Sequence, residues 1–134
     1  MAAVNGGDAV PRQHGTVLVV EDEGNLRQPI VKMLRNSGFA VLEAADGTSA
    51  IDLLRPKGAG IDVILLDMTI PGASSREVVE VAANVRPNIK VILISAYSQE
   101  MIKGSMRAPQ IRSFIRKPFQ IGELLNLLRS SLSS

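Results

Sequence analysis

One stretch, residues 61–72 (Ile-Asp-Val-Ile-Leu-Leu-Asp-Met-Thr-Ile-Pro-Gly), most constrains how this chain can fold. Its branched apolar residues 63–66 are what a strand needs when both of its faces are covered. The run stops at Asp67, and a Pro-Gly turn follows. Asp67 is therefore expected at the carboxyl end of a buried central strand, at the edge of an open parallel sheet where ligands bind. Taken alone, Asp67 could equally cap the helix that follows.

From Thr16 onward, short apolar runs alternate with longer amphipathic segments. This alternation predicts strands and helices in strict succession. The five expected strands cover residues 16–20, 39–43, 62–66, 90–94 and 112–115. The five expected helices cover residues 25–36, 47–54, 75–85, 98–106 and 120–132. Right-handed connections between such units give an α/β fold, a parallel sheet with helices on both faces.

Two prolines bear on the expected helix boundaries. Pro29 either sits in the first turn of its helix, where a missing N–H matters little, or bends that helix slightly. Pro56 is expected to close the second helix after Leu54, and residues 57–60 are expected to form a flexible link.

The bulk composition excludes several classes of protein. No apolar run approaches the ~20 residues of a membrane span, so no membrane partner is expected. The formal net charge is only +2 and the Lys and Arg residues are scattered, which argues against direct binding to nucleic acid. The absence of cysteine excludes disulfides and cysteine-ligated zinc, and it is compatible with a reducing cytoplasm, the expected location.

The length of 134 residues fits a single domain. Residues 1–15 have the Gly, Ala, Asn and Pro content of a flexible leader and lack the apolar core of a signal peptide. The folded domain is expected over residues 16–132, with 133–134 as a tail. His14 lies in the leader and is given no role.

Polar side chains follow three other strands of the predicted sheet. They are Glu21 and Asp22 after the first strand, Ser95 after the fourth and Lys117 after the fifth. Singly, each has an ordinary explanation as a helix cap, a loop hydroxyl or a solvated surface charge. Because the carboxyl ends of parallel strands meet at one rim, we expect all of them to lie around Asp67.

Three carboxylates in one pocket favour a divalent cation. At ~5 Å and an effective dielectric constant near 20, each pair repels by roughly 3 kcal/mol. Ligands that are all oxygen select Mg²⁺, with Mn²⁺ as the alternative. Lys117 supplies a further positive charge suited to a phosphate. The set therefore predicts a phosphoryl-accepting site, in which Asp67 needs no general base because its carboxylate is already ionised.

Four motifs closely resemble the receiver domains of two-component response regulators. They are Val-Leu-Val-Val-Glu-Asp-Glu at 17–23, Leu-Leu-Asp-Met-Thr-Ile-Pro-Gly at 65–72, Ile-Leu-Ile-Ser-Ala-Tyr at 92–97 and Phe-Ile-Arg-Lys-Pro-Phe at 114–119. The resemblance covers about residues 16–132. It implies a flavodoxin-like, doubly wound sheet of strand order 2-1-3-4-5. Asp-Met-Thr-Ile-Pro-Gly with Ser-Ala-Tyr is most similar to receivers appended to hybrid sensor kinases.

The resemblance also implies roles for individual residues. Asp67 would accept a phosphoryl group from a histidine kinase or phosphotransfer protein. Asp22 and Asp67 would bind Mg²⁺ with the backbone carbonyl of Thr69, and Glu21 would act mostly through metal-bound water. Ser95 and Lys117 would contact the phosphoryl oxygens, and the bond before Pro118 is expected to be cis.

A switch is implied as well. Ser95 would move towards the phosphoryl group, and Tyr97 would turn from exposed to buried. That motion would reshape the surface formed by the fourth helix, the fifth strand and the fifth helix. Such a domain is not an enzyme in the usual sense, because it catalyses at most its own phosphorylation and dephosphorylation.

Two departures from the family's pattern stand out. Ser75 occupies the position where many receivers have a glycine that opens the third helix. The Gly-Ala pair common before the fifth strand is replaced by Ala-Pro-Gln at residues 108–110. Both changes affect loops and leave the acidic residues intact.

Three alternatives remain open at the level of sequence. A receiver-like module could bind partners without phosphorylation. A haloacid-dehalogenase-type phosphotransferase also uses an Asp nucleophile, but it requires a second Asp at the position where this chain has Thr69. A flavodoxin is expected to have a hydroxyl-rich loop after the first strand, which this chain lacks. Both a stand-alone receiver and a fragment of a larger kinase fit the sequence, because no output domain follows Ser134.

Overall fold

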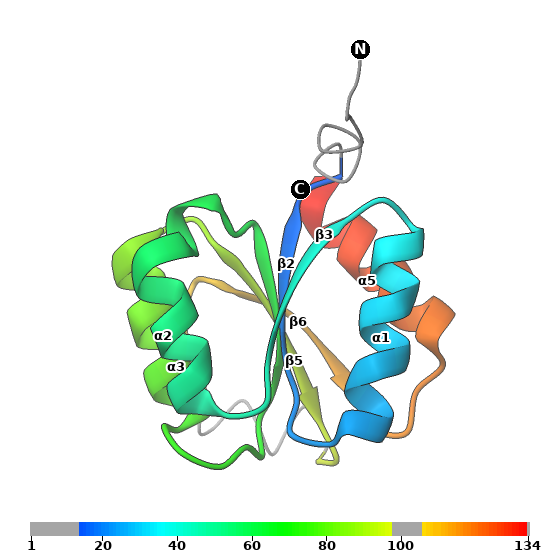
Figure 1. The fold of residues 1–134 in the computed structure, drawn as a ribbon, viewed down its shortest axis with the longest axis horizontal. Helices are drawn as coiled ribbons and strands as arrows, with labels where there is room; N and C mark the ends of the chain where they lie inside the picture. Colours follow the sequence, from blue (N-terminus) through cyan, green and yellow to red (C-terminus); the bar gives the residue numbers. More distant parts are fainter. Residues whose placement is uncertain (1–13, 98–105, 134) are drawn as a thin grey trace.

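A five-stranded parallel sheet lies between two layers of helices in the computed structural model, which describes residues 14–97 and 106–133 (Figure 1). The described elements follow in the order β2 (Thr16–Val20), α1 (Gly24–Asn36), β3 (Ala40–Ala44), α2 (Gly47–Lys57), the short 3-10 helix η1 (Gly58–Gly60), β4 (Val63–Asp67), α3 (Ser75–Val85), β5 (Lys90–Ser95), β6 (Ile111–Arg116) and α5 (Ile121–Ser133). Among these described elements, no helix combines the length and the apolar character that crossing a membrane requires.

The sheet order is β3-β2-β4-β5-β6, and every neighbouring pair is parallel. In the order of the strands along the chain this is 2-1-3-4-5, so the predicted flavodoxin-like topology is confirmed. The helices α1 and α5 cover one face, and α2 and α3 cover the other (Figure 1).

The central strand β4 is buried along its whole length, as its apolar run predicts. Alternate residues of the strands point to opposite faces and form two separate cores. Leu18, Ile64 and Leu66 belong to the core beneath α2 and α3. Val19 and Leu65 belong to the core beneath α1 and α5. Burial on both faces therefore fixes β4 in the middle of the sheet and places Asp67 at its end.

Several boundaries differ from the sequence expectation by one residue. The strands expected at 39–43 and 62–66 are shifted forward to Ala40–Ala44 and Val63–Asp67, and the last strand extends over Ile111–Arg116. Asp67 is thus the last residue of β4 rather than the first residue after it. The helix α5 runs to Ser133, one residue past the expected domain boundary.

The expected end of the second helix at Leu54 is wrong. The helix α2 continues through Pro56 to Lys57, where Pro56 is exposed and only one residue from the helix end, so the missing backbone hydrogen bond costs little. The segment expected to be a flexible link forms η1 instead. Its Gly58 is buried against Val85 of α3, and a Cβ added at Gly58 would lie 2.7 Å from Val85 Cγ1. Steric contact with α3 therefore orders this segment.

The remaining helix predictions have mixed outcomes. Pro29 is the sixth residue of α1, which excludes the first-turn alternative, and its ring is exposed. The helix expected at 98–106 falls mainly on residues outside the described ranges, and Met106, which is described, lies outside any helix and is buried.

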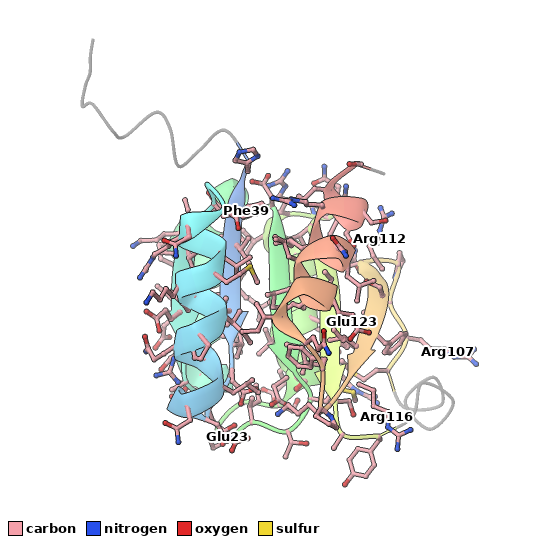
Figure 2. The ribbon with its side chains drawn as sticks, turned by 90° about the vertical axis from the view of Figure 1, so that its right-hand side faces the viewer. Glu23, Phe39, Arg107, Arg112, Arg116 and Glu123 are labelled. Atoms are coloured by element: carbon pink, nitrogen blue, oxygen red, sulfur yellow. The ribbon has the colours of Figure 1, made fainter. Side chains whose placement is uncertain are left out.

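The two ends of the sheet are chemically different. Phe39 lies at one end, where the ring of His14 packs on it with centroids 5.6 Å apart, and Glu23 and Arg116 lie at the opposite end (Figure 2). The second end is where the strands β2, β4 and β5 terminate, because all strands run in the same direction. The predicted functional residues follow those strand ends.

A glycine contact ties the loop after β4 to the start of α2. Gly47 N–H donates to Pro71 O at 3.0 Å, and a Cβ added at Gly47 would lie 1.8 Å from the Ala73 carbonyl oxygen. We predict that Gly47→Ala destabilises the protein by about 2 kcal/mol or more, because a backbone atom must move. Chemical denaturation measures this change.

Gly122→Ala is the matched control for that substitution. Gly122 lies in α5 and has no atom within 4 Å of an added Cβ. Alanine there should stabilise the helix by about 0.5–1 kcal/mol relative to glycine. Equal effects of the two substitutions would contradict the proposed contact.

Candidate functional site

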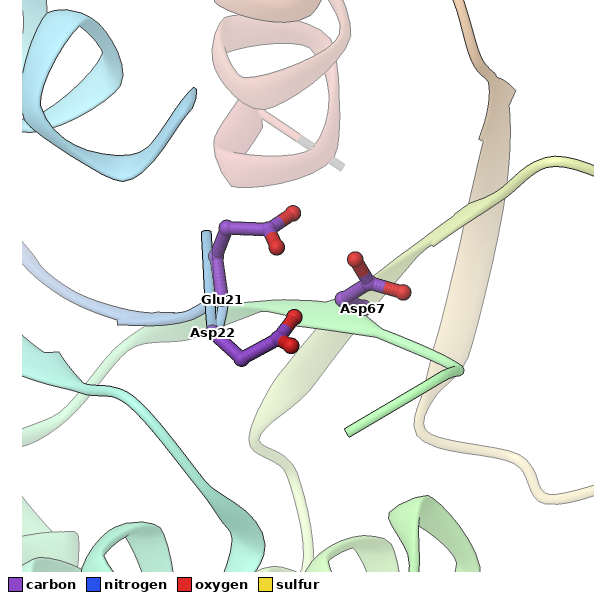
Figure 3. Close-up of side chains that lie close together, drawn as sticks. All are labelled: Glu21, Asp22 and Asp67. Atoms are coloured by element: carbon purple, nitrogen blue, oxygen red, sulfur yellow. The ribbon is translucent and has the colours of Figure 1, made fainter. Parts of the chain in front are cut away.

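Three acidic side chains converge at the end of β4 where the sheet terminates. Glu21 and Asp22 follow β2, and Val20 of β2 pairs in register with Leu66 of β4, so Glu21 lies level with Asp67. One carboxylate oxygen from each of the three residues lies within 4.8 Å of those of the other two (Figure 3). Glu21 and Asp67 are buried, whereas Asp22 is exposed. The structure therefore brings together the three carboxylates that the sequence predicted as a group.

Lys117 reaches into this cluster from the end of β6. Its Nζ lies 2.5 Å from Asp67 Oδ2, 3.2 Å from Glu21 Oε1 and 3.8 Å from Glu23 Oε1. Its backbone N–H donates to the Ser95 carbonyl at 2.7 Å, which anchors the segment to β5. The Lys117–Pro118 bond is cis, as the resemblance implied. One ammonium group thus faces both buried carboxylates.

The second oxygen of Asp67 is held by the loop that follows. Asp67 Oδ1 accepts a hydrogen bond from the Thr69 backbone N–H at 2.8 Å. Thr69 is exposed and lines an open cavity of about 390 Å³. The other residues lining that cavity are Asp22, Glu23, Asp67, Ala96, Tyr97 and Lys117. The acidic cluster therefore opens to solvent on the side where a small anion could reach Asp67.

Ser95 and Tyr97 lie beside this cavity in a single turn. Ser95 is the last residue of β5, is 2% exposed and is not among the cavity-lining residues. Its hydroxyl accepts a hydrogen bond from the Tyr97 backbone N–H at 2.9 Å. The Tyr97 side chain is 56% exposed. The structure therefore contains the exposed arrangement of Tyr97 from which the predicted switch would start.

Arg27 holds the loop that carries Glu21 and Asp22, a contact that the sequence analysis missed. Arg27 Nη1 donates to the Glu21 carbonyl at 2.8 Å, and Arg27 Nε pairs with Glu43 Oε1 at 3.1 Å. The only signal in the sequence was an arginine near the start of the helix after the acidic pair, and its partner Glu43 lies on β3. Arg27 and Glu43 therefore support the acidic cluster from outside it.

Burial perturbs the acid–base properties of the cluster. The pKa of Glu21 is raised from the ordinary 4.5 to about 7, chiefly by desolvation and then by the neighbouring Asp67, while the Glu23 backbone N–H and Lys117 oppose the rise. Burial by itself lowers the pKa of Lys117, but Asp67 and Glu21 outweigh it and hold that pKa above its ordinary value. The lysine is therefore charged at neutral pH, and the carboxylates are under-neutralised.

The donor set fits a hard divalent cation. Glu21 Oε1 is buried and has no hydrogen-bond partner among the described residues, since Lys117 Nζ approaches it without hydrogen-bond geometry. A buried carboxylate oxygen left in that state is costly unless a cation satisfies it. All the nearby donors are oxygens, which Mg²⁺ prefers. The residues present are thus suited to the metal that the sequence predicted.

Comparison with known proteins gives a consistent match. Residues 17–129 match the family described as the response regulator receiver domain. The chain is 29% identical over 117 residues to the sensor kinase CckA of Brucella abortus, covering 87% of this chain and 12% of that protein. It is 30% identical over 117 residues to sporulation initiation phosphotransferase F of Bacillus subtilis, covering 87% of this chain and 92% of that protein.

A solved structure shows the same fold. A response regulator receiver protein from Sinorhizobium medicae superimposes with a TM-score of 0.80 at 26% identity, covering 91% of this chain and 97% of that one. The chain spans about half the length, or less, of several of the curated relatives it matches.

The Glu21 carboxyl gives a prediction about pH. Its pKa is higher in the folded protein (about 7) than the ordinary 4.5, so the folded state binds the proton more tightly. The free energy of unfolding of the metal-free protein should therefore fall as pH rises from 4.5 to about 7, by up to about 3 kcal/mol, and then level off. Denaturation in EDTA across this range measures the change.

Glu21→Gln should remove that component, because glutamine does not ionise. The difference in stability between the wild type and this variant should change through the same pH window. Glu80→Gln, at an exposed position of α3, is the matched control. If the difference in the free energy of unfolding between the wild type and Glu21→Gln did not vary with pH, ionisation of Glu21 would be ruled out as the cause of the pH dependence.

Proposed function

This chain belongs to the response regulator receiver domain family, and from that premise we propose that Asp67 accepts a phosphoryl group from the phosphohistidine of a histidine kinase or phosphotransfer protein. The observation that carries the proposal is the meeting of Asp67 with Glu21, Asp22 and the Lys117 ammonium at one rim of the sheet. The receiver unit would cover residues 16–132. Its catalysis would be limited to its own phosphorylation and dephosphorylation.

The transfer step needs little from the protein beyond placement and charge. A carboxylate oxygen of Asp67 forms a bond to phosphorus while the bond from phosphorus to the imidazole nitrogen breaks, and the electron pair of that bond stays on the nitrogen. The step needs no general base, because the nucleophile is a carboxylate oxygen rather than a hydroxyl. Lys117, already 2.5 Å from Asp67 Oδ2, would shift its contact to the incoming phosphoryl oxygens.

The chain's own residues would also hold the metal. Asp22, Asp67 and the Thr69 backbone carbonyl are the proposed direct ligands of Mg²⁺ or Mn²⁺, with Glu21 acting through bound water. When bound, the cation neutralises charge on the phosphoryl oxygens. Arg27 supports this arrangement by fixing the Glu21 carbonyl at 2.8 Å from its Nη1.

The signal would leave the site through Ser95 and Tyr97. The Ser95 hydroxyl accepts the Tyr97 N–H at 2.9 Å, so turning that hydroxyl towards a phosphoryl oxygen either breaks this hydrogen bond or moves the Tyr97 backbone with it. A shift between two conformations from 1:99 to 99:1 takes ~5.5 kcal/mol of differential binding. The charge of a phosphoryl group beside Lys117 is the proposed source of that energy. A downstream partner would bind the altered surface near β6 and α5.

Phosphorylation of Asp67 is directly testable by intact mass. Incubation of the protein with acetyl phosphate and Mg²⁺ should add one phosphoryl group, because acetyl phosphate replaces the phosphohistidine as donor. Asp67→Asn should show no adduct, since the amide is not a nucleophile of this kind. Omission of Mg²⁺ or addition of EDTA should also abolish the adduct.

The control for that experiment is Asp52→Asn, an exposed aspartate of α2 that lies outside the acidic cluster. It should be phosphorylated like the wild type. An adduct that persists in Asp67→Asn would place the acceptor elsewhere and contradict the proposal.

Tyr97 offers a second test, because it is the only tyrosine in the chain. Its ring is 56% exposed, so its NMR signals should shift when beryllofluoride and Mg²⁺ mimic the phosphoryl group and the ring becomes buried. The shift should vanish in Ser95→Ala, which cannot couple the site to Tyr97. Ring signals that stay unchanged on addition of the mimic would refute the switch.

A further inference from the structure

We propose that Ser75 is a positioning residue for Asp67, a role that its place at the start of α3 does not require. Its single hydroxyl hydrogen is shared between two backbone carbonyls, those of Asp67 at 2.9 Å and Met68 at 3.0 Å from Oγ. The side chain is only 5% exposed. Its effect on phosphorylation rests on the function proposed above, whereas its effect on the shape of the loop does not.

Capping of the helix does not explain this serine. The cap of α3 is Ser74, whose hydroxyl accepts the Glu77 N–H at 3.1 Å while the Glu77 carboxylate accepts the Ser74 N–H at 3.2 Å. This reciprocal pair satisfies the orphan donors that a cap has to satisfy. The Ser75 hydroxyl is therefore available for a different purpose, and it points back to the end of β4.

The contact with the Met68 carbonyl reaches the Asp67 side chain through one peptide group. The peptide between Met68 and Thr69 has its carbonyl oxygen held by Ser75 Oγ at 3.0 Å and its N–H bound to Asp67 Oδ1 at 2.8 Å. Because a peptide group is planar, fixing its oxygen also fixes the direction of its N–H. Ser75 thereby determines where the Asp67 carboxylate is held, and leaves Oδ2 to Lys117.

The far part of the same loop is held independently. Pro71 O accepts the Gly47 N–H at 3.0 Å, and Thr48 Oγ1 accepts the Ala73 N–H at 3.2 Å. Those contacts fasten the loop to α2 but do not reach the peptide beside Asp67. The contact of Ser75 with this peptide is a side-chain contact, so a glycine at position 75 could not make it. The contact that holds the Met68–Thr69 peptide therefore depends on the serine side chain.

Ser75→Ala and Ser75→Gly test the inference. Outer partners of metal ligands change metal affinity or activity by about 10- to 100-fold, and Ser75 acts one bond further out, so we expect changes of about three- to tenfold. Hydrogen exchange at the Thr69 amide, measured by NMR without metal or phosphoryl donor, should become faster. Mg²⁺ affinity and the rate of phosphorylation by acetyl phosphate should both fall.

Ser74→Ala is the matched control, because it removes the N-cap of α3, and the Ser74 side chain hydrogen-bonds to Glu77 rather than to the Met68–Thr69 peptide. It should lower the melting temperature while leaving Thr69 exchange, Mg²⁺ affinity and the phosphorylation rate within about twofold of the wild type. Melting curves of both Ser75 variants establish that they fold. If Ser75 only stabilised the fold, Ser75→Ala would lower the melting temperature and leave Thr69 exchange, Mg²⁺ affinity and the phosphorylation rate unchanged, as expected for Ser74→Ala.

The outcomes distinguish the positioning role of Ser75 from the proposed phosphorylation of Asp67. Thr69 exchange and Mg²⁺ affinity in Ser75→Ala that match the wild type would overturn the positioning role, whatever the phosphorylation result. Faster exchange and weaker Mg²⁺ binding would support it. Failure of the wild type to take a phosphoryl group would overturn the proposed function alone, because the exchange measurement contains no phosphoryl donor.

Discussion

The contact of one lysine with two buried carboxylates is the interaction on which the site depends. Glu21 and Asp67 are almost completely removed from solvent, and Lys117 Nζ lies 3.2 Å and 2.5 Å from them. Charges of like sign that are buried side by side repel strongly, so the arrangement needs compensating positive charge. One ammonium does not satisfy the cluster, since the pKa of Glu21 stays raised and Glu21 Oε1, although 3.2 Å from Lys117 Nζ, accepts no hydrogen bond from the described residues. The site is thus built to attract further positive charge.

The sheet supplies the geometry that makes this concentration of charge feasible. Four neighbouring strands run parallel, with one register shift between β5 and β6, so the residues that end β2, β4, β5 and β6 share one rim. Helix residues then hold the loops: Arg27 of α1 binds the Glu21 carbonyl, and Ser75 of α3 binds the carbonyls of Asp67 and Met68 at the end of β4. The acidic residues are therefore held in place by both helical layers as well as by the strands.

Local signatures in the sequence predicted the strands and the acidic cluster, whereas the order of the strands in the sheet was implied by the resemblance to receiver domains. An apolar run followed at once by Asp67 shows both that β4 is buried and where it ends. The continuation of α2 through Pro56 was missed because its cost depends on solvent exposure and on distance from the helix end. Arg27 and its partner Glu43 were missed because they are 16 residues apart and meet only in the fold. Ser75 was noticed as a departure, but its two carbonyl partners were visible only in three dimensions.

The three carboxylates, faced by one lysine, form an under-neutralised site suited to a divalent cation. Calorimetric titration of the protein with Mg²⁺ tests it most directly. We expect saturable binding of one ion per chain. Binding should be lost in Asp22→Asn, which removes a proposed ligand but leaves the two buried carboxylates with Lys117 in place. Absence of saturable binding in the wild type, or equal binding by the variant, would contradict this expectation.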